Sequence, residues 1–231
     1  EAQLQPDPIT DPDDVFYAPF IGTTRQGQEF PSNGKVPSDT SMWQPRFGIS
    51  WNPNGDGRKV LRASAGIFYG RIPGLALASS RSTNGSRGQT IFRSSGVNFD
   101  GCLPVYPNKL AASCIGAPDH PDVFVFDEDF QNPRTTAASL SWEQEVIPNY
   151  AFLVKYNYAK GEHITRFTNG NDPLLWSGEP AGCTFACGPF SNGPGPGGTN
   201  GIGTLTVVSS TAKSLYHGIT LGVTKRPSSN V

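Results

Sequence analysis

The amino-acid sequence predicts an all-β fold built from antiparallel, up-and-down strands. Apolar and polar residues alternate in several segments, and alternation with a period of two places each set on its own face of a strand. Residues typical of turns separate these segments. Gly (27) and Pro (21) are abundant, while hydrophobic residues make up only 36% of the chain. Short ordered strands separated by much loop are therefore expected.

Composition and charge exclude several classes of protein. The formal net charge of −1 provides no basic surface of the kind that binds nucleic acid, so no nucleic-acid partner is expected. No run of about 18 apolar residues occurs, which excludes a transmembrane helix but not transmembrane strands. The chain has no initiator Met and no signal peptide, so we expect it to be an internal piece of a longer protein.

The first segment, residues 1–43, is expected to be a loop because it is rich in Pro, Asp and Gly. Its acidic run at residues 7–14 could hold Ca²⁺, but the run lacks the ordered spacing of a calcium loop, and a solvated loop is the preferred interpretation. The aromatic residues Phe16, Tyr17 and Phe20 are expected to anchor this segment on a neighbouring surface.

Residues 44–71 predict a hairpin. Phe47, Ile49 and Trp51 alternate with small or polar residues in the first strand, and the second strand alternates in the same way. The sequence NPNGDG between them collects the residue types of tight turns. One face is apolar and ends in aromatic rings, whereas the other is small, polar and cationic. This fits a half-buried soluble hairpin, and it fits a hairpin of an outer-membrane barrel, whose apolar face meets lipid.

Two later regions repeat the pattern. Residues 136–160 predict a second hairpin with a tight turn, and residues 213–231 predict a strand followed by a short turn. Long loops are expected between the strands, at residues 72–135 and 161–212. Residues 122–130 also alternate and could form a short strand within the first of these loops.

The lengths of the connections favour the membrane barrel. Outer-membrane barrels have short periplasmic turns, long extracellular loops and strands of about nine to eleven residues, and the sequence follows this alternation. The fold class predicted is therefore an incomplete segment of a transmembrane β-barrel with long extracellular loops, in the bacterial outer membrane and in contact with its lipid.

Charged and aromatic residues then assign the faces and the membrane interfaces. A Lys or Arg that faces lipid at the bilayer midplane costs roughly 2–4 kcal/mol, so charged strand residues should face the lumen. The residues concerned are Arg62, Glu143, Glu145 and Lys155. The aromatic residues expected at the two interfaces are Trp51 on the turn side and Tyr69, Tyr156 and Tyr158 on the loop side. His217 interrupts an apolar face near a loop, where an interfacial position would tolerate it.

The long loops contain the candidate ligand-binding residues. Arg81, Arg87 and Arg93 lie in a polar, Gly-rich, cationic stretch and could contact an anionic ligand or a lipopolysaccharide phosphate. A solvated loop with scattered charges is the simpler interpretation. Trp176 in the second long loop is a further candidate.

The four cysteines fall into two local pairs within the expected loops. These are Cys102 with Cys114 and Cys183 with Cys187. Three connectivities are possible, and disulfides between nearest neighbours are the simplest; they would indicate an oxidising compartment. A zinc site built from all four thiolates is disfavoured because the spacings are not of the CxxC type. We therefore expect disulfides and no metal.

No residue is assigned a catalytic role. His120, His163 and His217 are isolated in the sequence, and no nucleophile or metalloprotease motif occurs. Glu143 and Glu145 share one strand face and could act as glycosidase acids, but a place in the lumen wall explains them better. We expect neither an enzyme nor a cofactor.

Three segments resemble, in the same order, the barrel region of TonB-dependent outer-membrane receptors of the Oar-like type. The residues that carry the resemblance are 45–48, 52–53, 55–57, 62 and 66–69 in the first hairpin, Trp142, Glu145, Pro148, Tyr158, Gly161, His163 and Asn171 in the second, and Tyr216, His217, Leu221, Lys225 and Arg226 in the last strand. The sequence departs from the family at Ser64 and Ala65, which replace glycines, and at residues 159–160, which replace Val-Gly.

The resemblance implies active uptake of a large substrate across the outer membrane, such as a glycan, a peptide or a siderophore-like compound. The TonB complex would be a partner through N-terminal regions that this sequence does not contain, together with a plug and most of a barrel of about 22 strands. Two alternatives remain. One is an outer-membrane adhesion or assembly barrel. The other is a soluble, secreted carbohydrate-binding β-domain with exposed aromatic residues such as Trp43, and it requires the apolar strand faces to meet in a dry core.

Overall fold

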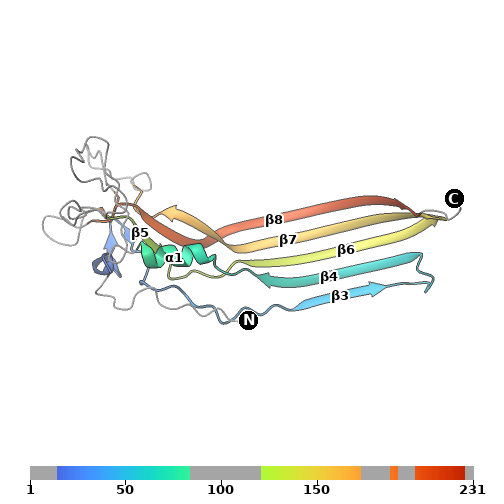
Figure 1. The fold of residues 1–231 in the computed structure, drawn as a ribbon, viewed down its shortest axis with the longest axis horizontal. Helices are drawn as coiled ribbons and strands as arrows, with labels where there is room; N and C mark the ends of the chain where they lie inside the picture. Colours follow the sequence, from blue (N-terminus) through green and yellow to red (C-terminus); the bar gives the residue numbers. More distant parts are fainter. Residues whose placement is uncertain (1–14, 84–120, 173–187, 192–200, 227–231) are drawn as a thin grey trace, which may run out of the picture.

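A single six-stranded sheet forms most of the ordered structure. The computed structural model describes residues 15–83, 121–172, 188–191 and 201–226. The strands are β3 (Arg46–Trp51), β4 (Lys59–Tyr69), β5 (Val123–Phe126), β6 (Arg134–Ile147), β7 (Tyr150–Asn169) and β8 (Leu205–Lys225). They lie in the order β3-β4-β6-β7-β8-β5, and the five long strands run side by side along the molecule (Figure 1). The predicted antiparallel all-β fold is confirmed.

Both expected hairpins form, each around a tight turn. β3 pairs antiparallel with β4 across a turn in which Gly55 and Gly57 have φ of 70° and 72°. β6 pairs antiparallel with β7 across a turn at Asn149, whose φ is 71°. Glycine adopts this left-handed conformation without a steric penalty, and Asn tolerates it better than most residues. The residue types of the two turns thus explain why the chain reverses there.

The strands β7 and β8 extend further towards the long loops than the sequence pattern indicated. β7 continues to Asn169 and β8 begins at Leu205, whereas the alternation had ended near residue 160 and resumed near 213. The pairing register shifts between Gly161 and Arg166, a β-bulge in which His163 has φ of 56°. A bulge breaks the period of two, because two residues on one strand oppose one on the other. The first residues of β8 are mostly buried, so they do not alternate either.

Helix α1 (Gly74–Ser82) lies where the sequence predicted only a loop. It follows Pro73, which takes the N-cap position without making a side-chain cap. Ala76 and Ser80, one helical turn apart, are its buried residues. Small side chains on one face and mixed polarity elsewhere produce only a weak helical pattern. The contact with β5, rather than an amphipathic sequence, holds this helix in place.

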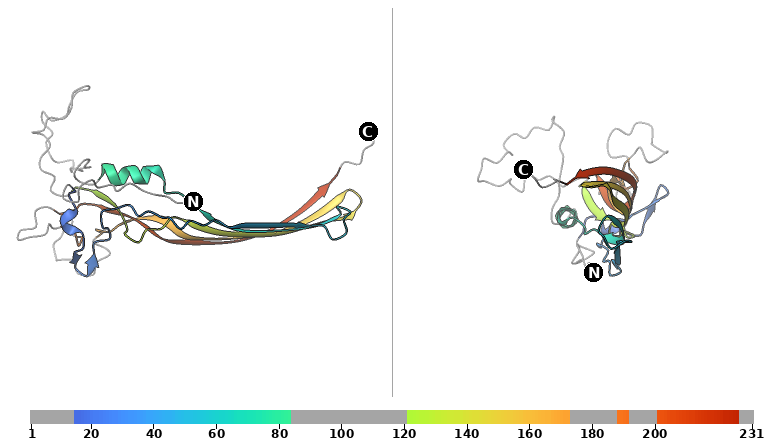
Figure 2. Two further views of the ribbon diagram at one scale, coloured as in Figure 1. Left: turned by 90° about the horizontal axis from the view of Figure 1, so that it is seen from below. Right: turned by 90° about the vertical axis from the view of Figure 1, so that its right-hand side faces the viewer.

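The short elements gather at the loop end of the sheet. They are the 3₁₀-helix η2 (Ala18–Phe20), the strands β1 (Thr24–Arg25) and β2 (Gln28–Glu29), α1, and β5, which pairs in parallel with the start of β8. We call these elements, with the described residues that adjoin them, residues 188–191 and 201–204, and the loop ends of β7 and β8, the loop-end cap. In Figure 2, α1 lies on the concave side of the curved sheet, and the β1–β2 hairpin lies on the convex side.

The buried hydrophobic core lies in the loop-end cap and not between faces of the long sheet. One cluster contains Val15, Tyr17, Phe20, Phe30, Val123, Val125, Phe190, Ile202, Leu205 and Val207, and a second contains Val36, Ile72, Ala76, Phe126, Phe130 and Val208. Phe30 and Phe190 meet edge to face with ring centroids 5.3 Å apart. The expected anchoring by Phe16, Tyr17 and Phe20 is confirmed, since Tyr17 and Phe20 are among the most buried side chains described and Phe16 packs against the first cluster.

Candidate functional site

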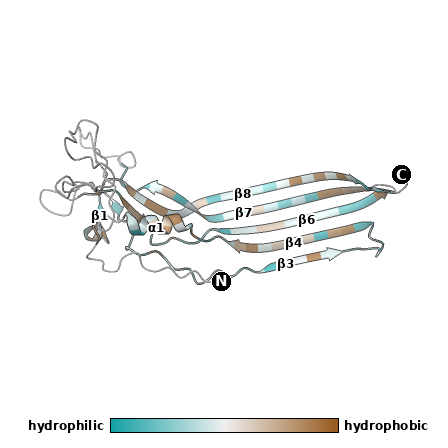
Figure 3. Cartoon of the chain, viewed as in Figure 1, coloured by the Kyte–Doolittle hydropathy of each residue, from teal (hydrophilic) through white to brown (hydrophobic). Residues whose placement is uncertain are grey.

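The register assigns every long-strand residue to one of two faces. One face carries Phe47, Ile49, Trp51, Leu61, Ala63, Ala65, Leu140, Trp142, Val154, Tyr156, Ile219 and Leu221. The other carries Arg46, Ser50, Arg62, Ser64, Ser139, Ser141, Glu143, Lys155, Asn157, Gly218 and Thr220. Alternating hydropathy along the strands is visible in Figure 3. We call the apolar face outward and the polar face inward, because only the apolar one suits lipid.

The inward face is lined by charged and hydroxyl side chains that pair across strands. The Nη1 atom of Arg62 lies 3.0 Å from the Oε2 atom of Glu143, and both side chains remain partly exposed. One level nearer the cap, the hydroxyl oxygens of Ser64 and Ser139 lie 2.8 Å apart. Lys155 lies on the same face, opposite Ser141 and Thr220. All of the charged residues expected to face the lumen within β4, β6 and β7 are thus on the polar side.

Two aromatic side chains on the inward face lie over glycines. The guanidinium carbon of Arg46 lies 4.7 Å from the centroid of the Phe68 ring, and that ring lies close to Gly66. The ring of Tyr216 covers Gly218, so that a Cβ atom at Gly218 would meet the phenol oxygen. Glycine here allows a large ring to lie flat along the sheet.

The outward face has a large exposed apolar surface. Ile219 and Leu221 are 73% and 75% exposed, and Trp51 and Trp142 are 57% and 51% exposed. An open groove of about 450 Å³ lies between these tryptophans and Leu140, Val154 and Tyr156. A soluble protein rarely exposes so large a contiguous patch. The dry core that the soluble interpretation requires does not form between the described strand faces.

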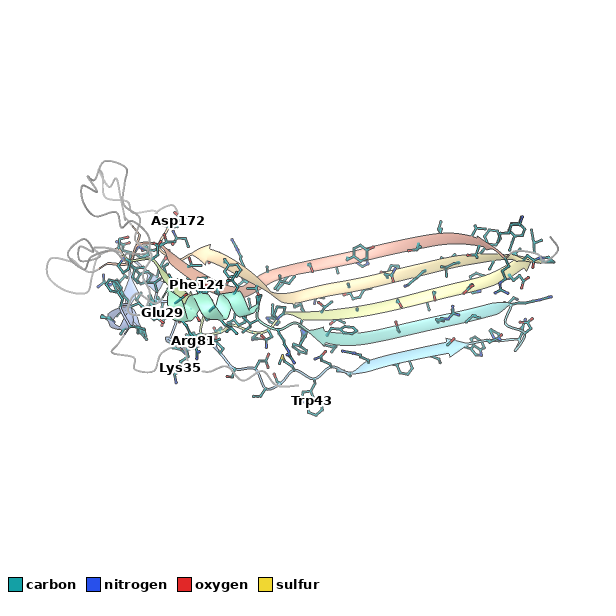
Figure 4. The ribbon with its side chains drawn as sticks, in the orientation of Figure 1. Glu29, Lys35, Trp43, Arg81, Phe124 and Asp172 are labelled. Atoms are coloured by element: carbon teal, nitrogen blue, oxygen red, sulfur yellow. The ribbon has the colours of Figure 1, made fainter. Side chains whose placement is uncertain are left out.

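Aromatic residues mark both ends of this apolar surface in β7 and its loop end in β4. In β7, the segment from Tyr150 to Tyr158 contains nine residues, which is the length of a transmembrane strand. In β4, Leu61 and Tyr69 bracket a window of the same length. We take these windows, with residues 217–225 of β8, as the membrane-spanning parts of the strands. Trp43, 81% exposed, projects away from the ribbon on the loop side of β3 (Figure 4).

His217 lies in an aromatic cluster at the loop end of the apolar surface. The Oη atom of Tyr156 lies 2.7 Å from its Nδ1 atom, and the Tyr158 ring meets the imidazole edge to face at 5.4 Å. Rings that combine an apolar body with a polar edge are typical of a membrane interface. This arrangement supports the interfacial position expected for His217.

Lys160 and Glu162, which lie beyond the spanning window of β7, form an ion cluster with Arg134 on the outward side. Glu162 accepts hydrogen bonds from Lys160, at 2.7 Å, and from Arg134, at 2.5 Å. Through these bonds Lys160 and Arg134 lower the pKa of Glu162 to about 2. The hydrogen bonds to Glu162 in turn raise the pKa values of Lys160 and Arg134. Sequence analysis did not identify this cluster, because only the register brings Arg134 next to Glu162.

Asn171 fixes two separate segments of the loop-end cap. Its side-chain amide nitrogen donates to Ser191 Oγ and to the carbonyl oxygens of Ile202 and Gly203, at 2.7 to 3.0 Å. Its Oδ1 atom accepts from the backbone N–H of Phe190, at 2.8 Å. A buried amide with all these bonds made is a strong positional constraint. Sequence analysis noted Asn171 only as part of a family resemblance.

The expected ligand-binding residues are described only in part. Arg81 lies exposed in the last turn of α1, on the cap (Figure 4). The other expected binding residues, Arg87, Arg93 and Trp176, and the expected disulfide residues, Cys102, Cys114, Cys183 and Cys187, lie outside the described residues. In the part of the chain that the structure describes, no three His, Cys, Asp or Glu side chains come together as metal ligands.

No helix among the described residues has both the length and the apolar character needed to cross a membrane. The sequence profile of a family described as "Outer membrane beta barrel domain" matches residues 9–231, which is most of the chain. A comparison with curated proteins finds no match.

Proposed function

The chain belongs to the outer membrane beta barrel domain family and resides in the bacterial outer membrane; from this premise we propose that it forms part of the wall of a TonB-dependent transporter barrel of the Oar-like type. The observation that carries the proposal is the contrast between the two sheet faces. Arg62, Glu143 and Lys155 line the inward face at mid-strand, whereas the outward face is apolar. A polar, hydrated lumen is what passage of a large polar substrate requires.

Energy for uptake would come from the TonB complex through a plug and a TonB box in regions outside this sequence. The resemblance of three strand segments to Oar-like receptors supports this partner. The described wall supports this further, because several inward side chains are short or paired across strands, as in Ser64 with Ser139 and Arg62 with Glu143. Such a surface can contact a movable protein domain without holding it by buried charge.

The substrate would first meet the loop-end cap. Helix α1, whose last turn carries Arg81, lies on the concave side of the sheet, where the entrance to a lumen would be (Figure 2). We propose that Arg81, with Arg87, Arg93 and Trp176, contacts a large substrate such as a glycan, a peptide or a siderophore-like compound. Arginine and tryptophan suit anionic groups and sugar rings respectively.

The dependence of substrate uptake on TonB distinguishes an active transporter from a barrel that does not transport. Cells that produce the full-length protein should accumulate a labelled substrate only when TonB is present and the proton-motive force is intact. Substrates drawn from an extract of the natural medium, identified by mass spectrometry, would define the cargo. Accumulation that is equal in cells with and without TonB would exclude the proposal.

An adhesion or assembly barrel is the second candidate, and the packing of the cap is the observation that favours it. The two hydrophobic clusters hold the cap in one shape, as a surface for a fixed partner requires. In that case, deleting the cap would abolish cell attachment, and deleting TonB would leave attachment unchanged.

A further inference from the structure

We propose that the outward surface of β6, β7 and β8, next to the exposed apolar surface on the side of the loop-end cap, binds the phosphate-bearing headgroup of an outer-leaflet lipid. The residues that form this surface are Arg134, Lys160, Glu162, Lys213 and His217. We call it the outer-rim site. It is separate from the substrate path, and it does not depend on the transport function proposed above.

The register places these cations on the same face as the lipid-facing side chains. Lys160 pairs with Leu215, and Arg134 pairs with Glu162, in continuation of the outward rows. Ser214 pairs with Gly161 on the inward face, so its neighbour Lys213 points outward. A soluble ligand inside the lumen would not reach them, because the sheet lies between.

Charge at the outer-rim site is unbalanced in favour of cations. Lys160 and Arg134 share the single carboxylate of Glu162, and Lys213, on the same face, makes no ion pair with the described residues. Glu162 therefore holds two cations in place without neutralising the site, which leaves donors for an anion.

The side chains next to the cations, on the membrane side, suit the remaining parts of a lipid molecule. The rings of His217, Tyr156 and Tyr158 pack together between the cations and the apolar surface. The apolar surface continues from this ring cluster towards the groove between Trp51 and Trp142. Acyl chains would lie on the apolar surface, the sugar or glycerol would lie at the ring cluster, and the phosphate would lie at the lysines. The order of these three layers along the strand is the order of the same layers in a lipid.

The ligand chemistry that fits is an anionic headgroup on a membrane lipid, for which diphosphorylated lipid A is a suitable probe. Lys and Arg next to a membrane gain affinity for anionic lipid of about fivefold per residue. The full-length protein in detergent would be titrated with diphosphoryl lipid A, with the same lipid after removal of its phosphates, and with inorganic phosphate, and complexes would be counted by native mass spectrometry.

The variants are K160Q, K213Q and the double variant, with K155Q as the matched control. Lys155 is on the same strand as Lys160 and carries the same charge, but it faces inward. We expect each outward variant to weaken binding of diphosphoryl lipid A about fivefold and the double variant about 25-fold. K155Q should bind as the unaltered protein does, and K160R/K213R should retain binding. Heat-modifiable electrophoretic mobility would verify that each variant is folded.

Three results would overturn the proposal. The first is unchanged lipid A binding by the folded K160Q/K213Q variant. The second is an equal loss in K155Q, which would show a general effect of net charge. The third is inorganic phosphate or dephosphorylated lipid binding as tightly as diphosphoryl lipid A, which would point to a free-anion site or to annular lipid contact alone.

Discussion

Arg62 and Glu143, 81 residues apart in the sequence, join β4 to β6 through an ion pair of 3.0 Å on the inward face. The next residue after Arg62, Ala63, points the other way and lies among Leu140, Tyr156 and Ile49. Adjacent residues of one strand thus face two different solvents. This contrast allows the assignment of faces to be tested with a single pair of substitutions.

We expect Ala63→Arg to lower the free energy of unfolding by about 2–4 kcal/mol, because the new charge would face the hydrocarbon region. Ser64→Arg, which adds the same charge one residue later on the inward face, should cost about 1 kcal/mol for the lost Ser64–Ser139 hydrogen bond. Urea unfolding of the full-length protein in lipid vesicles measures both. Equal losses for the two variants would reject the assignment of faces.

Replacing Asn171 by Ala should loosen the cap without unfolding the sheet. The change removes the hydrogen bonds to Phe190, Ser191, Ile202 and Gly203. It should lower the local free energy of opening by about 2–4 kcal/mol. Amide hydrogen exchange at Phe190 and Ile202 would report it.

The matched control for this change is Asn157→Ala, on the inward face of β7, the strand that precedes Asn171. It should leave exchange in the cap unchanged. Exchange at Phe190 that is as slow in the Asn171→Ala variant as in the unaltered protein would contradict the role given to Asn171.

The ion cluster at Glu162 should respond to acid at an unusually low pH. Its pKa is about 2 in the folded protein and near the ordinary carboxyl value when unfolded. A depressed pKa contributes stability that is complete above the ordinary value and is lost as the pH falls through about 2. Thermal unfolding of the unaltered protein and of the Glu162→Gln variant should therefore differ at neutral pH and converge near pH 2. A difference that disappears already at pH 5 would refute the low pKa.

Gly218 tests the packing of Tyr216 on the inward face. A Cβ atom at Gly218 would meet the phenol ring, which is 58% exposed and has to move, so Gly218→Ala should cost about 1 kcal/mol. The same change in a Tyr216→Ala background should cost little, and a double-mutant cycle of unfolding free energies measures the coupling. Gly222→Ala is the control, because its Cβ would lie at 3.6 Å from Leu153 in ordinary contact. Additive effects of the two changes would disprove the contact.

The sequence predicts the wall of this fold well, because one physical signal determines it. Alternation in residues 46–51 and 61–69 is enough to pair the first hairpin, and the charges of Arg62 and Lys155 are enough to assign the faces. The turn at Asn149 is equally local, since its residue types favour the backbone conformation found there. Each of these features depends on neighbouring residues only.

The cap and the outer-rim site depend on contacts between distant residues, which no local pattern records. Asn171 meets Ile202 across 31 residues, and Arg134 meets Glu162 across 28. Helix α1 has too weak a periodicity to be recognised, and the bulge at His163 removes the alternation of β7 where the strand enters the cap. The parts of the fold that depend on these contacts are therefore the ones that the sequence predicted least well.

The buried core lies at one end of the sheet. Two different environments therefore stabilise this chain, water around the cap and the lipid bilayer around the wall. The cap is held by the exclusion of water from Phe20, Phe190 and their neighbours, so urea and temperature act on it as they do on a water-soluble protein. The wall has no such core, and its order depends on the thickness and chemistry of the surrounding bilayer. Substitutions in the cap and changes in lipid composition can thus alter one part while the other stays intact, so the rigidity of the recognition surface and the fit to the membrane can evolve separately.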